Sequence, residues 1–229
     1  MNILAVDCAV SRLSIALKYD DKYISKTLDI GMKQSEMLVP VIDDILNTAG
    51  IKASDLNAGA LTIGPGSFTG LRLGISALKA IELAYGIPLY GISSLECYAY
   101  PFSSLNIPVL SCIDANKDKF YSSITKYSEE KKEIILEEED RETEKIIEEV
   151  KKLEKVIITG PDAVKLSEIL KKECKGTQFI LVKTNFDTAE SLIKITENMI
   201  EQKKEPLKDF DGPVYLRASE AEIKLNNAQ

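Results

Sequence analysis

The stretch IGPGSFTGLRLG, from Ile63 to Gly74, places four glycines and a proline between a strand-like apolar run and a helix-like apolar run. Such a loop is typical either of a phosphate cradle or of a backbone that passes close to another. It lacks the lysine of a Walker A loop, and Thr69 stands where GxGxxG needs its third glycine. Pro65 offers no N–H to an anion. We therefore favour close packing, with Ser67 or Thr69 capping the helix that follows.

Two amphipathic helices are predicted around this loop, from Ser35 to Ala49 and from about Leu71 to Tyr85. Each is followed by a glycine, which is a natural helix stop. Both carry apolar residues on more than one side, whereas a helix lying on a sheet needs a single apolar stripe. The second stripe predicts packing against a partner. Cover by the second half of the same chain is the alternative.

The order of elements predicts an α/β fold. The first hundred residues read as β-β-β-α-β-α-β, and a second run of strands and helices begins near Pro108. We expect an N-terminal lobe at 1–100 and a C-terminal lobe at 101–229. Each half opens with a strand that ends at an aspartate, Asp7 and Asp114, although no strong sequence repeat links the halves.

Composition excludes several classes of function. The 229 residues contain no histidine, which rules out a Ser-His-Asp triad and a histidine zinc site. The net charge of −7 disfavours a chain that grips nucleic acid alone. Four cysteines without CxxC spacing indicate reduced, buried thiols and a cytoplasmic protein. We expect no signal peptide, because Asp7 interrupts the first apolar run, and no membrane span.

Asp7 and Asp114 are the candidate chemical groups. A carboxylate at the end of a first strand can hold hydrated magnesium, with phosphate on the glycine loop, or it can cap a turn. The sequence leaves both readings of Asp7 open. For Asp114 we favour a turn, with Lys117 and Lys119 in solvent. If both aspartates bound magnesium-ATP, the chain would be a small actin-like ATPase or kinase, which is the alternative function. A peptidase without histidine has little support.

Four segments, ILAVDCA, GPGSFTGLRLG, YGISSLE and PVYLR, resemble the TsaB (YeaZ) family. These are bacterial partner proteins in making threonylcarbamoyladenosine (t6A) at position 37 of tRNAs that read A-starting codons. The resemblance implies two ribonuclease H-like lobes of the actin, Hsp70 and sugar-kinase type. It also implies a non-catalytic scaffold that dimerises with a TsaD-like catalytic subunit through its first two helices. On those helices, the expected contact residues are Leu38, Val41, Ile42, Ile45, Leu71, Gly74, Ile75 and Leu78.

The resemblance carries further expectations about partners and ligands. A TsaE-like ATPase would join the pair, tRNA would be reached only through the complex, and the isolated chain would form a homodimer. No metal and no cofactor are expected, with weak nucleotide binding left open. The residues of that vestigial nucleotide or phosphate site would be Asp7, Gly64, Gly66, Ser67 and Asp114.

The chain departs from the family pattern at three places. Val10 stands where a nucleotide site would want a hydroxyl. Gln34 and Ser35 replace a histidine before the first helix, and Asn116 and Lys117 replace an arginine pair after the second aspartate.

Overall fold

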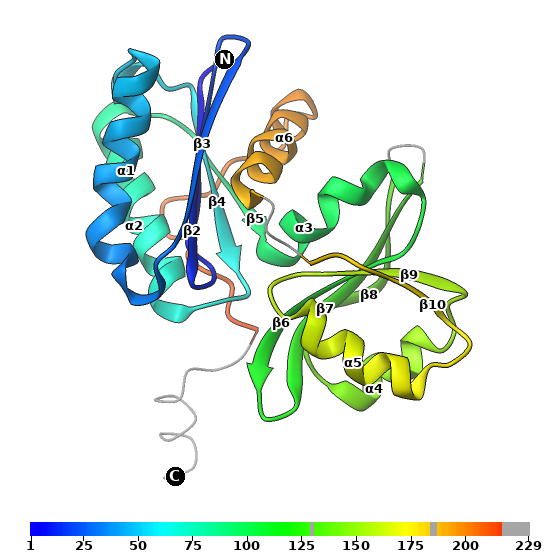
Figure 1. The fold of residues 1–229 in the computed structure, drawn as a ribbon. Coiled ribbons are helices and arrows are strands. Elements are labelled where there is room, and N and C mark those ends of the chain that lie inside the picture. Colours follow the sequence, from blue (N-terminus) through cyan, green and yellow to red (C-terminus); the bar gives the residue numbers. More distant parts are fainter. Residues whose placement is uncertain (129–130, 184–186, 217–229) are drawn as a thin grey trace.

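The computed structural model describes residues 1–128, 131–183 and 187–216, which form two five-stranded mixed sheets flanked by helices (Figure 1). The strand order is β3-β2-β1-β4-β5 in the first sheet and β8-β7-β6-β9-β10 in the second. Both follow one plan, an antiparallel three-stranded unit with two parallel strands added beside its first strand. The strands are β1 (Ile3–Asp7), β2 (Arg12–Tyr19), β3 (Lys22–Asp29), β4 (Ala58–Gly64), β5 (Leu89–Ser93), β6 (Val109–Asn116), β7 (Lys119–Ser128), β8 (Lys131–Glu142), β9 (Lys155–Thr159) and β10 (Gln178–Leu181).

The central strands of the first sheet are buried on both faces, and alternate residues of β1 point into different layers. Leu4 and Val6 point into the core beneath α1 (Gln34–Ala49) and α2 (Phe68–Tyr85). Ile3 and Ala5 point to the opposite face, which α6 (Thr188–Glu201) covers. Figure 1 shows this sandwich, with α1 and α2 on one side of the sheet and α6 on the other. The β-β-β-α-β-α-β order expected from the sequence is confirmed.

Both predicted helices are present, and both begin earlier than expected because their first turns are polar or glycine-rich. Gly50 and Gly86 end them in the left-handed conformation, with φ of 71° and 70°. Ser67 is the N-cap of α2, where its Oγ accepts a hydrogen bond from the Gly70 N–H at 3.2 Å.

The C-terminal part of the chain returns to the first sheet. The predicted division at residue 100 assigns α6 to the second lobe, but the side chains of α6 pack on β1, β2 and β4. Residues 205–216 also run back along the first sheet, where Leu207 donates a backbone hydrogen bond to Leu89. By packing, α6 and this segment therefore belong to the N-terminal lobe. A division of the chain into domains stays a prediction.

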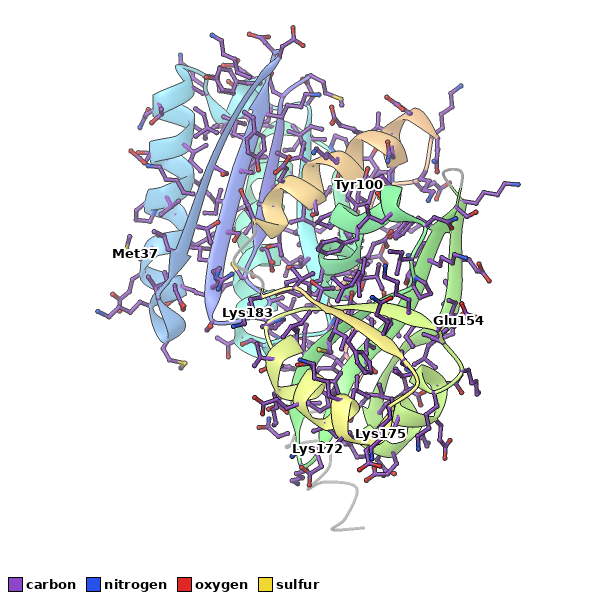
Figure 2. The ribbon with its side chains drawn as sticks, turned by 45° about the vertical axis from the view of Figure 1, so that its right-hand side comes forward. Met37, Tyr100, Glu154, Lys172, Lys175 and Lys183 are labelled. Atoms are coloured by element: carbon purple, nitrogen blue, oxygen red, sulfur yellow. The ribbon has the colours of Figure 1, made fainter. Side chains whose placement is uncertain are left out.

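Two further helices cover the second sheet, α4 (Thr143–Val150) and α5 (Ala163–Glu173). The sequence analysis missed α3 (Ser94–Ala99) and the 3-10 turn Tyr100–Leu105, which carry the chain from the first sheet to the second. Tyr100 lies beside α6, and its hydroxyl accepts a hydrogen bond from Asn198 at 3.1 Å (Figure 2).

Candidate functional site

Asp7 ends β1 inside the protein and is only 3% exposed. Its Oδ1 accepts hydrogen bonds from the Ala9 N–H and the Thr62 hydroxyl, both at 2.8 Å, and its Oδ2 accepts one from the Thr188 hydroxyl. Burial raises the pKa of Asp7, and these hydrogen bonds lower it only in part. The carboxylate therefore fastens the turn after β1 to β4 and to the start of α6. Of the two roles left open for Asp7, the turn cap is the one observed.

The glycine loop packs directly on the backbone that follows Asp7. Ser67 donates its N–H to the Ala9 carbonyl at 2.6 Å. A Cβ on Gly66 would meet that same carbonyl, and a Cβ on Gly70 would meet the carbonyl of Cys8. The close-packing prediction is confirmed within the chain itself. A phosphate-binding loop needs such N–H groups free, but here the Ser67 N–H is hydrogen-bonded to the Ala9 carbonyl.

Asp114 lies in β6 at the place in the second sheet that Asp7 occupies in the first. Its Oδ1 accepts the Asn116 N–H at 2.9 Å, and its Oδ2 accepts the Lys165 ammonium at 2.7 Å. Partial burial acts to raise the pKa of Asp114, but the Lys165 ammonium and the Asn116 N–H together lower it. Its own N–H donates to Asp162 at 2.8 Å. The expected turn is confirmed with Lys117 in solvent, but Lys119 is half-buried at the start of β7.

A cavity of about 750 Å³ opens between the two sheets, next to the glycine loop. Its walls come from the turn after β1, the starts of α1 and α2, the end of β6 and the segment at residues 214–216. Asp114 lines this cavity, whereas Asp7 lines a separate, smaller one beside Tyr98 and Thr188. The two aspartates therefore line different cavities, which have Val10 and Ser11 in common.

The residues of the expected vestigial site do not fit a magnesium-bound phosphate. The Asp7 carboxylate accepts hydrogen bonds from Ala9, Thr62 and Thr188, and the Ser67 N–H is engaged by the Ala9 carbonyl. Gly64 lies under the Val214 carbonyl, because a Cβ at this position would meet that oxygen. Across residues 1–128, 131–183 and 187–216, no group of three or more carboxylates, thiols or imidazoles is placed to hold a metal.

The family departures lie around the same cavity. Gln34 is buried, and its Nε2 donates to the Val10 carbonyl at 2.5 Å, so these two unusual residues contact each other. Asn116 ends β6 and Lys117 begins the tight turn to β7, with φ of 62° and 54°.

The structure places the expected partner residues in or against the N-terminal core. Seven of them are buried in the chain's own N-terminal core, and Ile75 packs against that core. On α2, the side that carries Leu71 and Leu78 packs into the core, whereas on the other apolar side Ala80 and Ala84 are exposed. The buried residues are Leu38, Val41, Ile42, Ile45, Leu71, Gly74 and Leu78.

Other apolar side chains of α1 and α2 do reach solvent. Val39 is 64% exposed and Leu83 is 89% exposed, while Met37, Phe68 and Tyr85 are exposed to a lesser degree. Met37 lies on the outer side of α1 in Figure 2. We call Met37, Val39, Phe68, Leu83 and Tyr85 the outer helix residues. Exposed apolar side chains are normal on a protein surface, so periodicity alone does not single these out.

Sequence reasoning also missed the residues that hold the two aspartates. Thr62 could have been found, because β4 and β1 were both expected to be strands and the ends of parallel strands meet at one edge. Thr188 and Lys165 lie far along the chain in unremarkable polar stretches, and no motif marks them.

The comparisons with known proteins agree with this fold. The family model described as "TsaD: tRNA N6-adenosine threonylcarbamoyltransferase" matches residues 31–224. The tRNA threonylcarbamoyladenosine biosynthesis protein TsaB of Bacillus subtilis is 25% identical over the full length of both chains. The TsaB protein of Escherichia coli is 35% identical over 124 residues, 53% of each chain, so that match spans about half the length of the relative.

A solved structure, "YeaZ from Pseudomonas aeruginosa", has a TM-score of 0.75 at 20% identity and covers 94% of this chain and 99% of its own. This likeness supports the two-lobed, actin-like α/β fold with paired five-stranded sheets. No helix in the described part of the chain combines the length and the apolar character that crossing a bilayer requires. With a family model matching well over half of its residues, this chain belongs to the TsaD-type tRNA N6-adenosine threonylcarbamoyltransferase family, and the relatives it resembles there carry the name TsaB.

Proposed function

We propose that this chain is a TsaB-type, non-catalytic subunit for making t6A at position 37 of tRNAs that read A-starting codons. In this proposal it binds and activates a TsaD-like catalytic subunit in the cytoplasm. The names of the relatives support the pathway, since the Bacillus subtilis protein of that name matches over its full length. A TsaE-like ATPase would join the pair, and tRNA would be reached through the complex.

The observation that supports the non-catalytic role is that both oxygens of the Asp7 carboxylate already accept hydrogen bonds from the protein. Three donors from three parts of the chain occupy its two oxygens in a buried setting. A magnesium ion with its water shell could reach this carboxylate only if those contacts broke. We therefore propose that the chain needs no cofactor and leaves nucleotide chemistry to its partner.

The partner surface that we propose is the outer side of α1 and α2. Of the outer helix residues, Met37, Val39, Leu83 and Tyr85 supply the apolar anchors. Ser76, Ala80 and Ala84 are small, exposed positions on the same helix as Leu83. Small residues let a second helix approach closely, while large apolar anchors supply most of the binding energy. In the absence of the partner, the same surface would pair with a second copy of the chain.

Binding to a TsaD-like subunit tests the proposal directly. Val39→Asp and Leu83→Asp change only exposed side chains, so urea unfolding should stay within about 0.5 kcal/mol of the wild-type value. Each should weaken the complex by about tenfold or more in calorimetry, because a charge then faces an apolar partner. Val164→Asp, at a 43% exposed position on α5, is the matched control and should bind normally.

Two results would contradict the proposal. If all three variants bind the TsaD-like subunit as tightly as the wild type, the outer side of α1 and α2 is not the contact. If the wild-type chain neither binds that subunit nor raises the yield of t6A in a reconstituted reaction, the proposed function itself fails.

A further inference from the structure

Residues 205–216 cross the N-terminal lobe without forming a helix or strand, and we call this segment the strap. Near its start, the Leu207 N–H donates to the carbonyl of Leu89 on the edge strand β5 at 2.7 Å. An added Cβ at Gly91 would lie 2.6 Å from Ile63 Cγ2 and 3.0 Å from Leu207 Cδ2, so these two side chains together take the space of a side chain at Gly91. The sheet thus leaves room for the strap at this point.

The far end of the strap is also held by a backbone hydrogen bond beside a glycine of the first sheet. The Val214 N–H donates to the Ile63 carbonyl at 2.6 Å, at the end of β4. Gly64 has a φ of 125°, and any side chain there would meet the Val214 carbonyl. One glycine of the loop that a nucleotide-binding protein would use for phosphate therefore accommodates the chain's own C-terminal segment.

Tyr215 completes this end of the strap by contacting the start of α2. Its hydroxyl accepts a hydrogen bond from Arg72 Nε at 3.0 Å, and its ring stacks on Phe68 with centroids 4.8 Å apart. The Arg72 guanidinium lies over the Phe68 ring at 3.8 Å. These three side chains join the strap to the first turn and a half of α2.

Between its two ends the strap is held loosely. Lys79 donates to the Lys208 carbonyl at 3.2 Å, but residues 208–212 are exposed, and the Phe210 side chain is fully so at 101%. A segment with few buried contacts and exposed backbone hydrogen bonds is one that opens locally. Val214, Tyr215 and Leu216 also line the large cavity, so opening this end removes part of a cavity wall.

We infer that Tyr215 acts as a latch for the strap. Its contacts with Phe68 and Arg72 hold residues 213–216 in the cavity wall, and they hold the first turn of α2 in place. Release of the latch frees residues 213–216, uncovers the glycine loop at Gly64 and loosens the first turn of α2 in a single local event. The rest of the fold stays intact during this event.

Hydrogen exchange of the full chain, resolved by peptide or by NMR, tests the latch. Tyr215→Ala removes both the ring and the hydroxyl, so the Val214 amide and the amides of residues 68–72 should exchange more than about tenfold faster. Tyr215→Phe keeps the stacked ring and should accelerate the same amides by only about fivefold. Tyr85→Ala, a half-exposed tyrosine at the other end of α2, is the matched control and should leave them unchanged.

The amides of β6 and β7 distinguish a latch from general stability. They should exchange at the wild-type rate in every variant. If Tyr215→Ala accelerates β6 and β7 as much as Val214, Tyr215 acts through global unfolding and the latch is overturned. If Val214 exchanges at the wild-type rate in Tyr215→Ala, the strap does not depend on Tyr215, and the inference is likewise overturned.

Discussion

Asp7 ends β1 and Asp114 lies near the end of the corresponding strand β6, in two sheets that share one plan, yet their surroundings are opposite. Asp7 is sealed beneath Thr62, Thr188 and the turn after β1, and burial raises its pKa. Asp114 faces the cavity and is held by an exposed lysine that lowers its pKa. The difference indicates that corresponding positions in the two sheets have different roles. Asp7 is a buried carboxylate that connects three segments of the chain, and Asp114 forms a surface ion pair.

The largest expected loss of stability lies in the close backbone packing around Asp7. Gly70→Ala should lower the free energy of unfolding, measured in urea, by about 3 to 4 kcal/mol. The added Cβ would overlap the Cys8 carbonyl oxygen. Gly74→Ala is the control on the same helix. Its Cβ would lie 3.7 Å from Cys8 Sγ, an ordinary contact, and alanine favours helix by about 1 kcal/mol.

Equal costs for the two glycine variants would contradict this account. They would show that the loop does not rely on its close approach to Cys8, and that Asp7 is less tightly enclosed than the structure indicates.

The next largest effect separates the two aspartates themselves. Asp7→Ala leaves the Thr62 and Thr188 hydroxyls and the Ala9 N–H without their buried acceptor, and should destabilise the fold by about 3 kcal/mol. Asp114→Ala removes an ion pair with the half-exposed Lys165, and should cost no more than about 1 kcal/mol. Chemical denaturation of both variants measures the contrast. Similar losses would show that the two sites are equivalent.

The pH dependence of stability should have opposite signs at the two positions. The folded pKa of Asp7 lies above its unfolded value, so the stability of the wild type relative to Asp7→Asn should fall as pH rises through the folded pKa. The folded pKa of Asp114 lies below its unfolded value, so its contribution relative to Asp114→Asn is present above the unfolded pKa. That contribution should be lost as pH falls through the folded pKa.

Each pKa unit of difference corresponds to about 1.4 kcal/mol, and exposure of the Asp114 pair reduces its share. Denaturation curves between pH 3 and 7 in matched buffers would measure both slopes (a range set by the usual carboxyl pKa of about 4). Slopes of the same sign would contradict the opposite environments.

The sequence predicted the order of elements in the first lobe and the glycine stops of α1 and α2, because these follow from local periodicity and backbone freedom. It also predicted that the glycine loop serves close packing, since the phosphate motifs are incomplete. It could not predict which flank of a helix the sheet would cover. Leu38 and Val39 are neighbours with similar side chains, and only the fold makes one buried and the other exposed.

Long-range contacts were the other limit. The return of α6 to the first sheet brings Thr188 to Asp7 across most of the chain, and the strap brings Tyr215 to Arg72. No spacing rule connects residues so far apart. The small side chains that accept α6, Ala5, Ala16, Ala58 and Ala60, were visible in the sequence only as unremarkable strand residues.

The most direct test of the central claim uses Asp7→Asn in a reconstituted t6A reaction with the TsaD-like subunit. Asparagine keeps an oxygen for Ala9 and Thr62 and can donate its amide to Thr188, but it cannot hold magnesium as a carboxylate does. The account predicts a yield within about twofold of the wild type. Loss of t6A by a variant that folds and still binds the TsaD-like subunit would show that the Asp7 carboxylate is chemically active.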